Sequence, residues 1–217
     1  DQPAQITPYQ NVKQTKPSVQ CPFRKGRCDK LRKGYQPVCS VRNSNDVMWI
    51  TCEHRLCATT INQKLPDGTE VINAPLIDHQ KNILNQVARE IYGDSQDLSS
   101  IGVRREAKVP VDDDTNYKAD YVMVDETNPG GICFVLEMQG GGETTGTGKL
   151  TKHVASWAES KSPTNANLRE SVSGVGTLET NAWRRQQEQF LVKGNVSTQT
   201  GGRIVFAVGT LFYEYMH

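Results

Sequence analysis

KADYVMV at residues 118–124, NPGG at 128–131 and ICFVLEMQ at 132–139 together predict a β-hairpin. Both arms are rich in β-branched and aromatic residues, and the Pro-Gly-Gly between them is typical of a turn. Side chains alternate between the two faces of a strand, so Glu137 and Gln139 share one face of the second arm. Depending on the exact turn, Asp120 lies opposite either Glu137 or Gln139. Directly opposed residues have Cβ atoms roughly 4.5–5.5 Å apart.

Two carboxylates at that separation repel each other unless a cation lies between them. Mg²⁺ suits such a pair, because it binds one or two carboxylates together with waters and a substrate phosphate. The ion polarises a phosphodiester and lowers the pKa of a bound water. Gln139 then lies beside the metal, where it orients the attacking water. The alternative is a half-exposed hairpin whose acids face solvent; the apolar run at 133–136 and the three glycines at 140–142 argue against it.

Cysteines are concentrated near the start of the chain, with five of the six between residues 21 and 57. Their spacing, Cys-x6-Cys-x10-Cys-x12-Cys-x4-Cys, matches no standard Cys-x2-Cys zinc pattern. Charged and turn residues dominate between them, so this segment buries too little apolar surface to order itself. A tetrahedral site of four thiolates would supply the missing folding free energy. Disulfides are the alternative; the odd count and the lack of a visible signal peptide favour reduced thiols, although a leader removed before Asp1 stays open.

Asp120, followed 17 positions later by the tripeptide EMQ at 137–139, resembles the PD-(D/E)xK nuclease signature in the variant in which Gln replaces the usual Lys. The proline that precedes the Asp in that family is absent, and Ala119 stands in its place. Together with the cysteine pattern, the chain from about residue 21 to about residue 215 resembles the NotI-type type II restriction endonucleases. The resemblance implies an α/β fold with a mixed central sheet flanked by helices, preceded by a small N-terminal Cys-rich metal module.

The same resemblance implies the chemistry and its residues. Asp120 and Glu137 would bind Mg²⁺, Gln139 would position water or a second ion, and Glu90 on the first long helix would assist; the alternative for Glu90 is an ordinary surface acid. The substrate would be double-stranded DNA cut at a specific sequence, by a symmetric dimer that matches a palindromic site. Matching the family's cysteine motifs in order gives four ligands for one iron or zinc ion: Cys21, Cys28, Cys39 and Cys52. Spacing alone does not prefer Cys52 over Cys57.

Three regions follow from this reading: a flexible arm at 1–20, the Cys-rich module at 21–60 and the PD-(D/E)xK-like catalytic domain at 61–217. Within the third region, apolar periodicity predicts a helix at 78–92 that Gly93 ends, and a strand at 101–109. Further helices are predicted at 150–161 and 181–193, a loop at 162–180, and a last, central strand at 203–211. An acidic triplet at 112–114 is predicted to be a hairpin tip, because it lacks the glycine and distal Glu of a calcium loop.

Charge is unevenly distributed although the net charge is only +1. The first 57 residues hold ten Lys or Arg and four Asp or Glu, a balance of +6, and the remainder has a balance of −5. A basic module beside an acidic body suits a protein that binds phosphates with one part and Mg²⁺ with the other; the alternative is that these basic residues are simply solvated. Candidate DNA contacts are Arg24, Arg42, Arg55, Lys149, Arg184 and Arg185.

Other functional classes are weighed against these motifs. The glycine-rich run at 142–150 lacks the first Gly and the Ser or Thr of a phosphate loop, having Glu143 and Leu150 instead, which excludes an ATPase. No run reaches membrane-spanning length, so we expect no membrane partner. Reduced thiols favour a cytoplasmic location, and the resemblance to restriction enzymes implies a bacterial one. Two alternatives to the restriction enzyme stay open: a non-catalytic, metal-folded DNA-binding module, and a repair or RNA nuclease on the same fold.

Overall fold

The computed structural model describes residues 20–29, 39–42, 48–65, 67–94, 97–110, 116–140, 152–153, 155–157, 159–173, 187, 190–191, 193–195 and 202–216. The predicted arm before Gln20, the acidic triplet at 112–114 and the glycine-rich segment after Gly140 lie outside this part of the chain.

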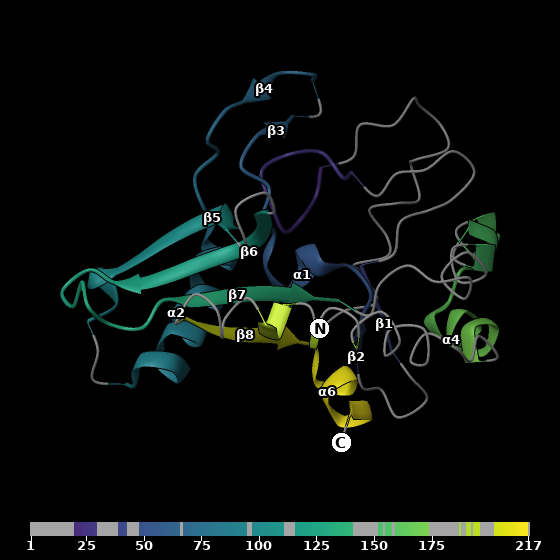
Figure 1. Ribbon diagram of the computed structural model, residues 1–217. Coiled ribbons are helices and arrows are strands. Elements are labelled where there is room, and N and C mark those ends of the chain that lie inside the picture. Colours follow the sequence, from purple (N-terminus) through teal and green to yellow (C-terminus); the bar gives the residue numbers. More distant parts are fainter. Residues whose placement is uncertain are drawn as a thin grey trace.

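Four strands form one mixed sheet in the order β5-β6-β7-β8 (Figure 1). They are β5 (Ile101–Pro110), β6 (Asn116–Asp125), β7 (Phe134–Gln139) and β8 (Arg203–Val208). β5, β6 and β7 are antiparallel neighbours, and β8 runs parallel to β7. The predicted hairpin is therefore present as β6 and β7, and the amide of Gly131 donates to Asn128 O at 2.7 Å within its turn.

One face of the sheet packs against α2 (Asp78–Tyr92). Leu84 and Ala88 of this helix join Tyr121 of β6 and Leu136 of β7 in the main core. The helix has the predicted bounds, and Gly93 follows it with φ of 94°, a backbone conformation that favours glycine. A short 3-10 helix, η3 (Leu98–Ser100), leads from there into β5.

A short helix, α1 (Glu53–Cys57), connects the Cys-rich segment to this core. Cys57 is fully buried in the main core, and its Sγ lies 3.1 Å from the hydroxyl of Tyr121. That hydroxyl donates to Ala58 O at 2.5 Å, and Gln80 Nε2 donates to the same oxygen. The helix that follows Cys52 is thereby attached to the central sheet.

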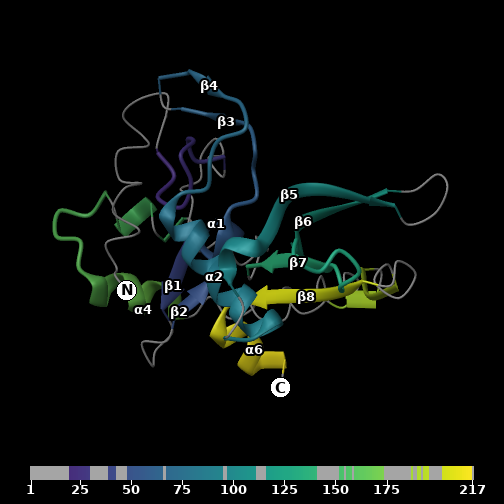
Figure 2. The same cartoon turned by 90° about the vertical axis from the view of Figure 1, so that its left-hand side faces the viewer.

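The remaining elements are small. β1 (Ser40–Arg42) pairs with β2 (Met48–Ile50), and β3 (Gln63–Lys64) pairs with β4 (Glu70–Val71), both antiparallel. The last helix, α6 (Thr210–Met216), packs on β2 through an edge-to-face contact between Phe212 and Trp49. The β3–β4 hairpin and α6 lie at opposite ends of the molecule (Figures 1 and 2).

Four sequence-based predictions differ from the structure. The last strand ends at Val208, because Gly209 follows and Phe212 turns back onto Trp49 as part of α6. β8 is an edge strand of the four-stranded sheet rather than a central one. Helix α4 (Asn165–Ser173) lies within the predicted loop at 162–180. The described residues of the helix predicted at 181–193 are helical, but the helix continues through Asn195 instead of ending at Gly194.

Within the described residues, no helix combines the length and the apolar character needed to cross a membrane.

Candidate functional site

Three carboxylates form a row across the sheet, on the face opposite the main core: Glu106, Asp120 and Glu137. The β6–β7 ladder pairs Tyr121 with Leu136, so its next step places Asp120 opposite Glu137. In the β5–β6 ladder, Arg105 pairs with Tyr121 and Ala107 pairs with Ala119. Glu106, which stands between them, therefore lies opposite Asp120. Of the two predicted partners of Asp120, the register thus selects Glu137. These acids alternate with core residues along each strand, which puts them on the other face.

Backbone amides hold the two predicted magnesium ligands. Asp120 Oδ2 accepts from the Met138 amide at 2.8 Å, and Glu137 Oε1 lies 3.3 Å from the Asp120 amide that donates to it. Each carboxylate is therefore fixed by the strand that carries the other. Glu137 is only 2% exposed, whereas Asp120 is half-buried.

Lys193 supplies a cation to this pair. Its ammonium lies 2.5 Å from Glu137 Oε2, and it also stands over the ring of Tyr117, 5.1 Å from the centroid. The lysine comes from a helical stretch described at residues 190–191 and 193–195, far from the hairpin in sequence. A second contact places these residues over the same face: Phe190 packs edge-to-face on Phe206, the β8 residue paired with Glu137.

Burial and neighbouring charges act in opposite directions on the two acids. Burial raises the pKa of Glu137 above its usual value, while the hydrogen bond and charge of Lys193 partly oppose the shift. Burial also raises the pKa of Asp120, against the Met138 amide and Lys193, and the negative charges of Glu53 and Glu106 add to the increase. A bound cation or a bound proton would relieve both the repulsion and the loss of hydration.

The other two predicted catalytic residues differ in position. Gln139 ends β7 on the face that carries Glu137, two residues away, as predicted. Glu90 is exposed on α2, the helix that covers the opposite face of the sheet. The structure does not bring Glu90 to the carboxylate pair, because the helical stripe that guided its choice packs against Tyr121 and Leu136 rather than against Asp120.

Glu106 and Lys193 were missed by the sequence analysis. Glu106 has φ of 48°, in the left-handed region that non-glycine residues seldom adopt, and Lys118 pairs with its carboxylate at 2.8 Å. Alternation along β5 would have put Glu106 on the correct face, but only the pairing register places it beside Asp120. No local sequence signal marks Lys193, because its contact depends on how the helical residues around it fold back over the sheet.

The predicted cysteine ligands are buried, and three of them gather in one cluster. Cys21, Cys28 and Cys39 pack with Phe23, each at most 8% exposed. Cys52 is also buried, and its amide donates to Cys39 O at 3.2 Å. Cys57 belongs instead to the main core, with Tyr121. Cys57 therefore lies outside the cluster formed by Cys21, Cys28 and Cys39. All six cysteines fall within the described residues, and no disulfide joins them.

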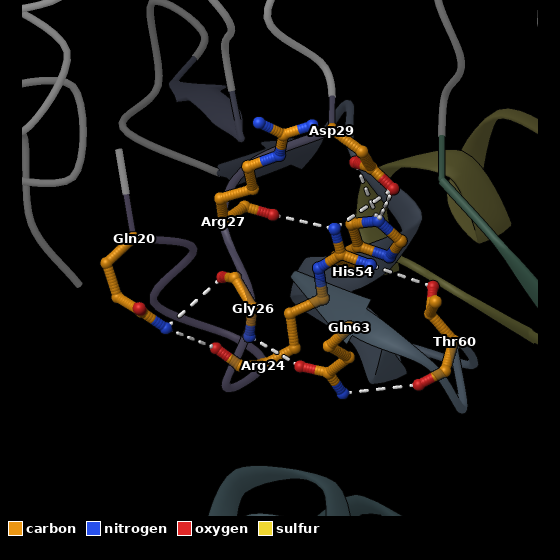
Figure 3. A network of polar contacts seen from close by, with 8 residues as sticks. All are labelled: Gln20, Arg24, Gly26, Arg27, Asp29, His54, Thr60 and Gln63. Atoms are coloured by element: carbon orange, nitrogen blue, oxygen red, sulfur yellow. Dashed lines mark hydrogen bonds and ion pairs between the residues drawn. The ribbon is translucent and has the colours of Figure 1, made fainter. Parts of the chain in front are cut away.

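Polar contacts rather than apolar packing organise the chain around these cysteines (Figure 3). Asp29, directly after Cys28, lies 3.0 Å from Nε2 of His54, which follows Cys52 by two residues. Arg24 contacts Asp29 at 3.3 Å and donates to Thr60 Oγ1 at 2.9 Å. The amide of Gly26 donates to Gln63 Oε1. Segments that carry different cysteines are thereby linked to each other and to β3.

Two of the predicted DNA contacts are wrong. Arg24 is 5% exposed and engaged by Asp29 and Thr60, and Arg55 is 7% exposed with its guanidinium over the Phe23 ring. Both side chains stabilise the segment from within, so neither presents its charge to a phosphate. The side chain of Arg42 and the residues Lys149, Arg184 and Arg185 lie outside what the structure describes.

The two sites fit metals to different degrees. Asp120 and Glu137 form the kind of oxygen pair that Mg²⁺ accepts when waters and a phosphate complete its shell, and the Lys193 ammonium already occupies a cation position on Glu137. The cysteines fit a thiolate-bound metal in chemical type and in burial. However, no three His, Cys, Asp or Glu side chains in the described ranges are grouped so that they could hold a metal ion.

Comparisons of the chain with protein-family models, with curated proteins and with solved structures found no match.

Proposed function

We propose that this protein is a Mg²⁺-dependent endonuclease of the PD-(D/E)xK type that cuts double-stranded DNA at a specific sequence. The observation that carries the proposal is the pairing of Asp120 with Glu137 across β6 and β7, with the Lys193 ammonium on Glu137. The resemblance to NotI-type enzymes implies Asp120, Glu137 and Gln139, and Lys193 adds a cation beside them. Lys193 compensates for the Gln at position 139, where the usual motif has Lys.

Each residue has a distinct task in this proposal. Asp120 and Glu137 hold the ion, which when bound supplies a Lewis acid for the scissile phosphate and a water of lowered pKa. Gln139 accepts a hydrogen bond from the attacking water and so orients it. Lys193 places a positive charge near the phosphate, where negative charge grows as the water attacks.

The N-terminal segment is proposed to hold one iron or zinc ion through Cys21, Cys28, Cys39 and Cys52. Burial and the clustering of three of these thiols with Phe23 support this choice. The charge balance of residues 1–57 suits a segment that lies against DNA. A homodimer is proposed by resemblance, because a two-fold protein matches a palindromic site.

Cleavage of supercoiled plasmid in Mg²⁺ tests the proposal. The wild type should produce discrete fragments, and Asp120→Asn and Glu137→Gln should each lower the rate by at least about 10³-fold, because one charged ligand is lost. Glu90→Gln is the matched control, since it makes the same change on an exposed face and should leave the rate within about twofold.

Three outcomes separate the alternatives. Fragments that persist at full rate in Asp120→Asn contradict the catalytic assignment. DNA binding without cleavage by the wild type favours a non-catalytic metal-folded module. Cleavage without sequence preference, or of RNA, indicates a repair or RNA nuclease built on the same site.

A further inference from the structure

The ammonium of Lys193 is held from two directions. Glu137 Oε2 lies 2.5 Å from Nζ, and the face of the Tyr117 ring has its centroid 5.1 Å from the same atom. Tyr117 precedes Asp120 by three residues on β6. A cation within about 6 Å of an aromatic centroid is attracted to the ring's negative face. The lysine side chain is 16% exposed, so this attraction is only partly screened by water.

These two contacts respond differently to a divalent cation. An ion bound by Glu137 neutralises the carboxylate that attracts Lys193 and repels the ammonium directly. The ring face of Tyr117 is uncharged and is not a ligand for Mg²⁺, so its attraction persists. A lysine has a flexible four-carbon stem, and without a second contact its head group would leave the site once Glu137 is occupied.

The Tyr117 hydroxyl contributes little to this arrangement. Its oxygen is buried and makes no hydrogen bond within the described chain. Burying a hydroxyl without a partner is unfavourable, so stability alone would favour phenylalanine here. The ring face is therefore the part of the side chain that contacts Lys193, and replacement by Phe separates the ring from the hydroxyl.

We propose that Tyr117 is a positioning residue that keeps the Lys193 ammonium over the carboxylate pair when Glu137 binds a cation. The inference rests on the proposed nuclease function for its effect on rate. Its structural part, that the ring holds the lysine, stands independently of catalysis.

The test compares Tyr117→Phe, Tyr117→Leu and Lys193→Met by the kinetics of plasmid cleavage in Mg²⁺. Tyr117→Phe should retain kcat within about twofold, whereas Tyr117→Leu should lower kcat by about 3- to 30-fold, the range of a cation–π contact. KM should stay within about twofold, because in this proposal the ring acts through Lys193. The double variant Tyr117→Leu/Lys193→Met should be no slower than Lys193→Met, since both changes remove one interaction.

A second measurement needs no nuclease activity. Limited acetylation followed by mass spectrometry reports how accessible each lysine is, and Lys81, 57% exposed on α2, serves as the internal reference. Modification of Lys193 relative to Lys81 should increase severalfold in Tyr117→Leu and stay at the wild-type ratio in Tyr117→Phe. Tyr117→Met provides the same comparison if leucine impairs folding.

These results test the positioning role of Tyr117 and the proposed nuclease function separately. An unchanged acetylation ratio in Tyr117→Leu overturns the positioning role, and so does an equal loss of kcat in Tyr117→Phe and Tyr117→Leu. Absence of cleavage by the wild type overturns the proposed function, while the acetylation ratio still decides whether Tyr117 holds Lys193.

Discussion

The carboxylate row and the cysteine cluster are ordered by different forces. Asp120 and Glu137 lie on neighbouring strands, and each is fixed by an amide of the strand opposite. The cysteines lie among short elements, such as the three-residue β1 and the isolated bridge between Gln20 and Arg27, held by polar side-chain contacts. Strand pairing alone brings the two carboxylates together. The cysteine segment has few apolar contacts of its own, and in our proposal a metal ion supplies the missing stability.

The largest expected effect follows from removing one thiolate. Cys28→Ser should lower the free energy of unfolding by several kcal/mol and abolish the iron or zinc content, because a ligand set that supplies folding energy is broken. Metal analysis and urea denaturation measure both. Cys133→Ser, which alters a half-buried cysteine next to β7, is the matched control and should keep about one metal ion per chain. Wild-type protein that contains neither iron nor zinc would contradict the proposal that a metal ion stabilises the cysteine cluster.

The next effect concerns the junction between the two regions. A Cβ at Gly140, the residue after β7, would lie 2.8 Å from Glu53 N and 3.0 Å from both Cys52 C and Thr51 O, all backbone atoms. Gly140→Ala should therefore destabilise the protein by roughly 1–3 kcal/mol.

Urea denaturation measures this change against Gly130→Ala, because a Cβ at Gly130 meets no atom within 4 Å. Equal midpoints for Gly140→Ala and Gly130→Ala would show that the end of β7 and the Cys52 segment separate easily.

A smaller, pH-dependent effect distinguishes Cys57 from the clustered cysteines. Burial, partly opposed by the hydrogen bond with Tyr121, raises the pKa of Cys57 from 9.0 to about 11. A raised native pKa adds stability that is fully present below pH 9 and is lost as the pH rises through 11. Between pH 8 and pH 10 the loss should be about 1 kcal/mol.

Chemical denaturation at both pH values tests this loss against Cys57→Ala, which has no thiol to ionise. The same pH dependence in wild type and Cys57→Ala would assign the loss to other groups.

The smallest effect is on stability at the carboxylate row. Asp120→Asn should raise the free energy of unfolding at pH 7, without added Mg²⁺, by roughly 0.2–1 kcal/mol, because it removes repulsion from Glu106 and Glu53. The raised native pKa of Asp120 means that its contribution is present below the usual carboxyl range and lost as the pH rises through the native value. The gain should therefore shrink at pH 4.

Thermal unfolding at pH 4 and pH 7 measures this difference, with Glu90→Gln as a control that should show none. A variant less stable than the wild type at pH 7 would mean that the Asp120 carboxylate stabilises the row even without a divalent ion.

Short sequence patterns correctly predicted those features that depend on residues near each other in the chain. The apolar spacing of α2, the hairpin of β6 and β7, and the facing of Asp120 and Glu137 all depend on residues close in sequence. Lys193 and Glu106 depend on tertiary folding and on the β5 register, which no short motif specifies. Charge alone misled the choice of Arg24 and Arg55, since a guanidinium buried inside a segment looks the same in sequence as one that faces DNA.

The attachment of α1 to the sheet limits where this chain can be joined to another sequence in a chimera. Tyr121 on β6 contacts Cys57 and Ala58 across the core, and Arg27 donates its amide to Lys64 O on β3. A chimera that exchanges the N-terminal segment at residue 60 would cut through both connections. A crossover beyond β3 preserves the bond between Arg27 and Lys64. The exchanged segment must still provide the small buried thiol and the carbonyl that Tyr121 requires.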